Sequence, residues 1–575
     1  MDISASTEKK TIQGFFKNWK SVVPIAEWLP DYNKKFLGMD LVAGITLASF
    51  VLPESMAYAT LAGLPVQTGI YCCMAGGLLY AIFTSSKHLA VGPTSAISLM
   101  VGTTIATMAG GDPARWLAIA GLTALVVGVI CLAAFLLKLS SLVSFISESI
   151  LLGFKAGAAL SIMSTQLPKF FGVEGGGGHF FERIGILIQH LPQTNPVVLI
   201  FGSIAMLLLI LGDKIFPGKP VSLVVVVLSI LSVTFLPFLK SHLHITGDIP
   251  GGLPSIGRPS LRLSDVDGVI ELAFACFLMG YIETVSAART FALKNNYEVS
   301  PRQELLSLGA ANFAAAFASG YPVAGGLSQS TVNEKSGAKT PLSLIICSVT
   351  LAVLLLFCTS LLYDLPEVLL AVIVLHAVAG LIKVKDLKQL YGLSRMEFLV
   401  AMIALAGVLI FGILKGVMIA AILSLAFLIR KLASPNVAVL GRIGNTDRYS
   451  DLERHPDNVQ LQEILILRVE ASLLYFNVEH IRDQFNRRIQ AAGKNVKLII
   501  LDMSSSPYVD VAGSKMLLQL SRDLATKGIH FRIVEALASV RDMLRKQGME
   551  QLVGHISRKT SINDAVNELT QPSGS

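Results

Sequence analysis

Long uncharged stretches decide which kind of fold is open to this chain. Residues 116–137, 220–239 and 340–363 each contain no Asp, Glu, Lys or Arg. About 20 apolar residues in a helix span the roughly 30 Å hydrocarbon core of a bilayer. Charged residues make up only 15% of the chain, whereas about 25% is usual in a soluble domain. The sequence therefore predicts an integral, polytopic α-helical membrane protein.

Basic residues flank the predicted membrane region at both ends. Several lysines precede the first apolar segment, and Arg430 and Lys431 follow the last. Lysine and arginine gather on the cytoplasmic side of membrane proteins, so we expect both termini in the cytoplasm and an even number of spans. The formal net charge of +8 then reflects membrane topology, and no nucleic acid partner is expected. No signal peptide is recognisable, and a bacterial inner (plasma) membrane fits the chain.

The apolar segments fall into two sets of seven. The first set lies near residues 41–60, 66–84, 93–108, 116–137, 142–165, 196–212 and 219–240. The second lies near residues 266–292, 303–319, 327–339, 341–362, 366–382, 398–414 and 416–431. Because seven is odd, the second set starts on the opposite side of the membrane, and the halves form an inverted repeat. We expect a cytoplasmic N-terminal segment (1–40) and a membrane domain (41–432).

One segment in each half is interrupted by glycine, proline and hydroxyl side chains. The interruptions are residues 91–98 (VGPTSAIS) and 321–330 (YPVAGGLSQS). A paired interruption of this kind points to the binding site of an inverted-repeat transporter, because irregular backbone at membrane depth must be covered by protein or line a cavity. The N–H groups at the start of a half-helix favour an anion. Ordinary helix capping by Thr94, Ser95 or Ser328 is the alternative.

Two glutamates stand inside apolar segments. Glu283 lies in the stretch LMGYIETV, while Glu54 follows Pro53 and shares a polar notch with Tyr58. A carboxylate at membrane depth costs at least ~2.5 kcal/mol on insertion scales, so it usually faces a pore or a partner. We therefore predict that both glutamates line an ion pathway. The alternatives are a Glu283 pair with Arg289 and a Glu54 side chain that reaches the membrane surface.

Other polar groups support no catalytic or metal chemistry. Asn312 and His376 lie within apolar segments, and we interpret both as interhelical hydrogen-bonding residues rather than ligands. The six cysteines form no CxxC pair or ligand-like cluster, so neither disulfides nor a metal site is expected. No nucleophilic triad, Walker A loop or HExxH motif is present. An enzyme, an ATP-driven pump and a bound cofactor are therefore not predicted.

The composition changes after the last apolar segment. Strand-like runs alternate with helical patterns in the order 464–469, 478–490, 496–501, 514–526 and 530–534. Strands that alternate with helices are typical of a small α/β domain. We place this cytoplasmic domain at residues 445–570.

Four stretches resemble a known family. Residues 53–65 (PESMAYATLAGLP) resemble the first-span signature of the SulP sulfate permease family. Residues 91–100 (VGPTSAISLM) resemble its third span, and residues 327–341 (LSQSTVNEKSGAKTP) resemble its tenth. Residues 501–513 (LDMSSSPYVDVAG) look like part of a STAS domain. The similarity covers nearly the whole chain and keeps the order of the family's motifs.

The resemblance implies fourteen segments arranged as a core and a gate domain, with the substrate between the third and tenth segments. Family members are typically dimers in membrane lipid that move sulfate, bicarbonate, chloride or dicarboxylates. Glu283 matches the acid that is tied to proton coupling in plant-type sulfate symporters. By position, the implied pocket residues are Glu54, Tyr58, Thr94, Ser95, Ser328 and Gln329.

Three positions depart from the family pattern. Many members have Gln where this chain has Glu54, and Arg where it has Gln329. We therefore expect a pocket that has lost its fixed cation and gained an acid, next to which a dianion would be repelled. In the STAS domain, Val511 follows Asp510, where regulatory members have a serine that becomes phosphorylated. A dimer-shaping or trafficking role is expected for this domain.

The predicted function is secondary active anion transport, with sulfate taken up together with protons by alternating access. A proton on Glu54 or Glu283 would accompany the anion. The alternatives are a bicarbonate or dicarboxylate symporter coupled to H⁺ or Na⁺, and a passive anion exchanger or channel on the same fold. A third alternative is a membrane sensor, whose membrane domain only binds the ligand and whose STAS domain signals. Buried glutamates favour active transport, because a passive pathway gains little from them.

Overall fold

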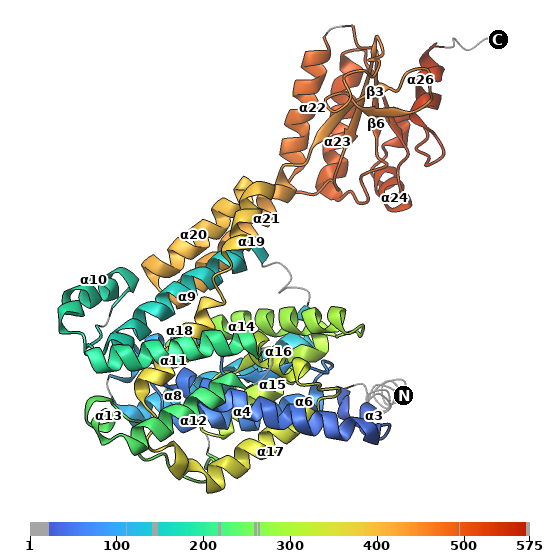
Figure 1. The fold of residues 1–575 in the computed structure, drawn as a ribbon. Coiled ribbons are helices and arrows are strands. Elements are labelled where there is room, and N and C mark those ends of the chain that lie inside the picture. The colour runs from blue at the N-terminus through green and yellow to red at the C-terminus, as the bar shows by residue number, and fades with distance from the viewer. Residues whose placement is uncertain are drawn as a thin grey trace. The chain divides into compact units, whose positions relative to one another are not determined.

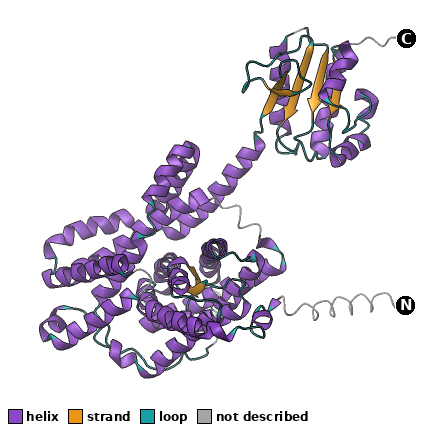
Figure 2. Cartoon of the chain, turned by 45° about the vertical axis from the view of Figure 1, so that its right-hand side comes forward, coloured by secondary structure: helices purple, strands orange, loops and turns teal. Residues whose placement is uncertain are grey.

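The chain forms two compact units, Met1–Ser424 and Leu425–Ser575. The computed structural model describes residues 22–110, 112–140, 148–176, 178–216, 220–257, 262, 265–493 and 495–570. Most of the predicted N-terminal segment (1–40) therefore lies outside the described residues. The first unit is mainly helical with two short strands, and the second combines a mixed sheet with helices (Figures 1 and 2).

The first half of the membrane unit alternates long helices with one short strand. Two of its segments are irregular, because a π-helical turn joins α5 to α6 and a strand precedes α7. Its elements are α3 (Ile25–Trp28), η1 (Lys34–Phe36), α4 (Leu37–Leu61), α5 (Val66–Tyr71), η2 (Cys72–Gly76), α6 (Gly77–Phe83), β1 (Ala90–Gly92), α7 (Ser95–Ala109), α8 (Pro113–Leu136), α9 (Glu148–Phe171), α10 (Phe180–His190), η4 (Leu191–Gln193), α11 (Pro196–Ile215), α12 (Val221–Phe235) and α13 (Pro237–His242).

The second half repeats the same order of long helices around one strand. Its elements are α14 (Val266–Lys294), α15 (Pro301–Phe317), β2 (Ala324–Gly326), α16 (Leu327–Lys335), α17 (Leu342–Phe357), η6 (Thr359–Leu362), α18 (Glu367–Ala379), α19 (Val384–Leu393), α20 (Arg395–Phe411) and α21 (Ile413–Ala433). Eight helices of the described chain are long and apolar enough to cross a membrane, and three further apolar helices are shorter. The polytopic helical fold is thus confirmed, while the count of fourteen spans stays a prediction.

The two halves meet in a two-stranded antiparallel sheet. Ala90 pairs with Gly326, and Gly92 pairs with Ala324. An antiparallel arrangement is what an inverted repeat requires of two equivalent strands. Strand pairing also satisfies backbone groups that would otherwise be unpaired in the interior of the unit. β2 leads directly into α16, and only Pro93 and Thr94 separate β1 from α7, so the sheet fixes where both helices begin.

Small residues bring α9 and α20 unusually close. A side chain at Gly153 would lie 1.9 Å from the Ala401 carbonyl oxygen, and one at Gly157 would lie 2.8 Å from that of Leu405. Glycines four residues apart form the small-xxx-small face on which membrane helices pack. This contact fixes the rotation of α9 about its own axis.

The second unit is an α/β domain with a five-stranded sheet in the order β4-β3-β5-β6-β7. β3 pairs antiparallel with β4 and β5, while β5, β6 and β7 are parallel. Its elements are β3 (Val437–Arg442), β4 (Tyr449–Asp451), β5 (Ile464–Val469), α22 (Val478–Ala492), β6 (Leu498–Asp502), α23 (Val511–Thr526), β7 (His530–Val534), α24 (Ala538–Lys546), α25 (Glu550–Val553) and α26 (Ile562–Thr570).

Alternating side chains give this sheet two buried faces. Leu465, Leu467 and Val469 belong to one hydrophobic cluster, while Ile464 and Ile466 belong to another. This follows from the two-residue period of a strand, and parallel strands buried on both faces read as continuous apolar runs. The domain bounds of 445–570 stay a prediction, but β3 lies before residue 445 and pairs with β5 in the same sheet.

Two amphipathic helices were not among the predicted segments. α10 and α19 are 11 and 10 residues long, too short and too polar to be found by a search for bilayer-spanning stretches. α19 lies between the predicted segments 366–382 and 398–414 and carries Asp386 in its first turn.

Candidate binding pocket

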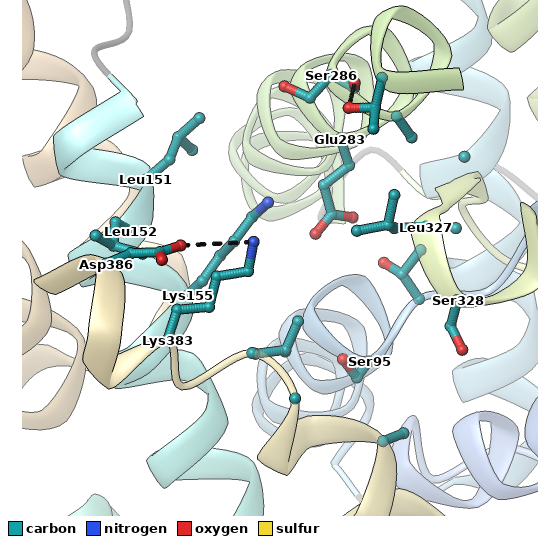
Figure 3. A pocket seen from close by; sticks show the side chains of 18 of the residues that line it. Ser95, Leu151, Leu152, Lys155, Glu283, Ser286, Leu327, Ser328, Lys383 and Asp386 are labelled. Atoms are coloured by element: carbon teal, nitrogen blue, oxygen red, sulfur yellow. Dashed lines mark hydrogen bonds and ion pairs between the residues drawn. The ribbon is translucent and has the colours of Figure 1, made fainter. Parts of the chain in front are cut away.

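One pocket of the membrane unit gathers all the residues that the sequence analysis assigned to the anion and proton sites. Its volume is about 480 Å³. Acidic, basic and hydroxyl side chains face each other in it (Figure 3). The predicted residues that line it are Glu54, Tyr58, Thr94, Ser95, Glu283, Ser328 and Gln329. Their roles stay predictions, but their common location is a property of the fold.

Two helix starts form one wall of the pocket. α7 begins at Ser95 after Thr94, and α16 begins at Leu327 after Gly326. Thr94 makes no side-chain capping hydrogen bond, and Gly326 has no side chain that could make one. Capping by Thr94 is therefore not observed, while Ser95 and Ser328 lie inside their helices. The first N–H groups of a helix have no intrahelical partner, and the helix dipole favours negative charge there. Both helix starts therefore suit an anion.

Buried polar side chains hold the irregular backbone of the two strand–helix segments. Asn312 accepts a hydrogen bond from Val323 N at 3.0 Å and donates to the Val323 carbonyl oxygen at 3.1 Å. The hydroxyl of Thr284 accepts from Gly325 N at 2.9 Å, and that of Ser330 accepts from Ala90 N at 2.9 Å. Asn312 is thus a hydrogen-bonding residue between elements, as its position in an apolar helix predicted.

Glu54 lies on α4 and is almost fully enclosed. Its exposed fraction is 3%, so it does not reach the membrane surface. Tyr58 donates its hydroxyl proton to Glu54 Oε1 at 3.1 Å, one helical turn away. The second oxygen, Glu54 Oε2, is buried and has no hydrogen-bond partner. Pro53 lies inside the same helix, which continues through it.

Glu283 lies on α14 and faces the same space as Glu54. Its Oε2 atom is buried without a hydrogen-bond partner, as are Thr94 Oγ1 and Gln329 Oε1. Within the described residues, Glu283 forms no ion pair with Arg289. The pocket therefore contains three acceptor oxygens and one hydroxyl without a hydrogen bond of normal length, with Gln329 beside Glu54 and Thr94 beside Glu283. Unpaired buried polar atoms are costly, and their concentration in one cavity indicates a place for a proton, an ion or a solute.

Two lysines correct the expectation that the pocket has no cation. Lys155 of α9 and Lys383 at the start of α19 both line it, and their side chains extend toward Glu283 (Figure 3). Lys383 is paired with Asp386 at 3.8 Å. The positive charge that Gln329 lacks is thus supplied from other elements, across the cavity from the two helix starts.

Sequence reasoning missed Lys155 although the signal was present. It is the only charged residue between Glu148 and Lys169, and the rule that selected Glu283 applies to it equally.

His376 lies outside the pocket. It bonds Asp213 at 2.8 Å between α18 and α11, as predicted for an interhelical contact. No group of three or more His, Cys, Asp or Glu side chains in the described residues is arranged to hold a metal ion.

Comparison with known proteins places the chain in a family. Residues 37–404 match the sulfate permease family, and residues 455–565 match the STAS domain. The chain belongs to the sulfate permease family. It is a multi-pass membrane protein with a C-terminal STAS domain, and its family consists of transporters rather than enzymes.

Relatives and solved structures agree over most of the chain. A probable sulfate transporter of Mycobacterium tuberculosis is 29% identical over 535 residues, covering 92% of this chain and 96% of that protein. Probable sulfate transporter 4.2 of Arabidopsis thaliana is 30% identical over 571 residues, covering 96% and 84%. The murine anion transporter Slc26a9 has the same fold, with a TM-score of 0.87 at 24% identity, covering 95% and 94%. The transmembrane domain of a cyanobacterial bicarbonate transporter, BicA, matches at 0.60 and 23% identity, covering 68% and 98%.

Proposed function

We propose that this sulfate permease family member is a secondary active transporter that takes up sulfate together with protons by alternating access. Relatives named as sulfate transporters cover nearly the whole chain. The pocket offers two uncapped helix starts, the hydroxyls of Ser95 and Ser328, and two lysines. Amide, hydroxyl and ammonium groups are the donors that bind oxyanions in proteins.

The open carboxylate oxygens of Glu54 and Glu283 carry the proton part of the proposal. Three acidic side chains line the pocket, against two lysines. Two like charges 4 Å apart repel by about 4 kcal/mol at the effective dielectric of a protein surface. A sulfate that enters between two ionised glutamates is therefore disfavoured, whereas protonation removes the repulsion and turns each carboxyl into a hydrogen-bond donor.

Uptake into liposomes tests this function. The purified full-length protein is reconstituted in sodium-free buffer, and labelled sulfate uptake is measured at several external pH values. We expect uptake to rise as the exterior becomes more acidic, and sulfate to accumulate above its external concentration until a protonophore collapses the gradient. Uptake that does not depend on pH argues against proton coupling, and equilibration without accumulation indicates a passive pathway.

A sodium-coupled bicarbonate transporter is the second candidate. Glu54 Oε2, Glu283 Oε2 and Gln329 Oε1 are open acceptors, and oxygen atoms of this kind suit a hard cation such as Na⁺ as well as a proton. The match to the bicarbonate transporter domain concerns the fold alone. Uptake of externally added labelled bicarbonate, sulfate and dicarboxylates into the same liposomes, with and without sodium, distinguishes the two candidates.

The remaining expectations belong to the same proposal. We place both termini in the cytoplasm of a bacterial inner membrane and expect a homodimer. We do not expect the STAS domain to work as a phosphoswitch at Ser514, because this serine is fully buried and donates its hydroxyl to the Val511 carbonyl oxygen.

A further inference from the structure

The position of Lys155 follows from the packing of α9. Gly153 and Gly157 hold one face of this helix against α20. Residues two positions apart in a helix differ by about 200° in direction, so Lys155 is turned away from α20. Leu151 and Lys155, one turn apart, line the pocket together. The close helix contact thereby fixes a lysine in the wall of the cavity.

In the described part of the chain, Lys155 forms no close ion pair, and the acid whose charge acts on it across the cavity is Glu283. Lys155 is half-buried, and no hydrogen bond or ion pair involving it occurs among the described residues. Its side chain extends across the cavity toward Glu283 (Figure 3). An ionisable residue within a membrane helix is costly and generally faces an ion pathway or a partner. The open side of this ammonium group is the pocket itself.

We propose that Lys155 is the cation that binds the transported anion and sets the preference of the pocket for divalent over monovalent anions. The inference deepens the proposed anion transport and depends on it. The anion lies between Lys155 on one wall and the starts of α7 and α16 on the other. Because the attraction grows with the charge of the solute, a dianion gains more from Lys155 than a monoanion does.

Lys383 is less suited to this role, although it lines the same pocket. Its side chain is 56% exposed and already paired with Asp386. An exposed charge is screened by water and salt, and a surface ion pair contributes little. We therefore assign the main binding charge to Lys155.

Transport kinetics of matched variants test the assignment. In reconstituted full-length protein, Lys155→Met is expected to raise the KM for sulfate about tenfold or more and to raise the KM for a monovalent anion less. Lys155→Arg keeps the charge and is therefore expected to keep the preference for divalent over monovalent anions. The matched control is Lys169→Met, which removes a half-buried lysine of the same helix that does not line the pocket. It is expected to leave the KM unchanged.

Chemical rescue covers the case in which Lys155→Met folds poorly. Lys155→Cys is reconstituted and treated with a methanethiosulfonate reagent that adds an ethylammonium group, or with a neutral reagent of similar size. Restoration of the sulfate KM by the charged reagent alone supports the proposal, with treated wild type as the control for the native cysteines.

Three results would overturn the assignment. They are an unchanged KM in Lys155→Met, equal effects on divalent and monovalent anions, and a larger effect from Lys383→Met. If the wild type transports none of the anions tested, the proposed function itself is wrong. If the wild type is active and Lys155→Met is unaffected, only the assignment of Lys155 is wrong.

Discussion

Buried acids in this protein differ in whether their hydrogen bonds are complete. Glu304 accepts hydrogen bonds from Tyr80, from Thr84 and from both the amide and the hydroxyl of Ser85. Glu54 and Glu283 each keep one buried oxygen without a partner. A carboxylate that is fully bonded to neighbouring elements holds structure together, whereas an open one is available to a proton or an ion. On the proposed function, this difference in hydrogen bonding distinguishes the structural Glu304 from the two glutamates to which we assign a transport role.

Replacing Glu283 with glutamine tests whether this glutamate couples proton movement to anion transport. Glu283→Gln keeps the shape of the side chain but removes its titration, so we expect loss of proton-driven sulfate accumulation while exchange of internal for external anion persists. Counterflow and gradient-driven uptake in the same liposomes separate the two activities. Glu298→Gln alters an exposed glutamate and should leave both unchanged. Full accumulation by Glu283→Gln would contradict its role in coupling.

Replacing Glu304 with alanine tests whether its hydrogen bonds stabilise the fold. The change leaves several buried donors unpaired, and breaking such a network costs about 3 kcal/mol. We expect a clear drop in the thermal unfolding temperature of the detergent-purified protein. Glu298→Ala serves as the matched control. Unchanged stability of Glu304→Ala would show that water replaces the lost carboxylate.

Single residues were predictable where their own neighbourhood in the sequence is informative. Glu54 and Glu283 stand out because a charge inside an apolar segment is rare. The role of Glu304 could not be read in this way, because its donors lie more than 200 positions away in the chain. The expectation of a missing cation was wrong because it considered only the aligned position of Gln329, while the charge comes from another helix.

At the scale of elements, the two segments that the hydropathy pattern predicted as broken helices each contain a short strand followed by a helix. The sequence predicted the interruptions at residues 91–98 and 321–330, but not that two three-residue strands, β1 and β2, would pair there. Strands of three residues lack a detectable period, and their partners are remote in the chain. Long apolar helices, in contrast, are set by local composition, and their ends were predicted to within about six residues, the largest difference being at α9.

The close approach of the two strands makes their glycines sensitive to substitution. A Cβ at Gly325 would lie 2.9 Å from Leu89 Cδ2 and 3.0 Å from Thr284 Cα. Gly325→Ala must therefore displace α14 or the sheet, and we expect a loss of about 1–3 kcal/mol of stability together with reduced uptake.

Thermal unfolding and initial uptake rates measure both effects. Gly185→Ala is the control, because this exposed glycine of α10 has open space at its Cβ and alanine favours a helix. Wild-type stability in Gly325→Ala would mean that the sheet tolerates a shift.

At the scale of the whole molecule, the STAS domain has its own core and should fold alone. Its two hydrophobic clusters contain only residues beyond position 436. We expect residues 435–570 to give a soluble fragment that unfolds cooperatively. A fragment of residues 445–570 lacks β3, whose backbone pairs with both β4 and β5, and should be markedly less stable. Equal stability of the two fragments would contradict the importance of β3.

The stability of that fragment should fall in acid. The hydrogen bond from Arg468, with a second from Asn436, lowers the pKa of Glu470 below its ordinary value of 4.5. A group with a lowered pKa in the folded state contributes stability above its unfolded pKa and loses it as the pH falls through the folded value. We expect Glu470→Gln to show a shallower decline below about pH 4.5.

Urea unfolding at a series of pH values measures this effect. Glu479→Gln, which changes an exposed glutamate of α22, should follow the wild-type profile. A Glu470→Gln profile parallel to that of wild type would show that the ion pair contributes nothing.

The β1–β2 pair also constrains how the protein is made. While the ribosome is still translating the second half, Ala90, Val91 and Gly92 have already been synthesised, yet the residues that pair with them do not exist. Their backbone must wait inside the translocation machinery or beside water until Ala324–Gly326 emerges. Neither half can pair its central strand without the other. We therefore expect that the two halves, expressed as separate polypeptides, would not fold independently.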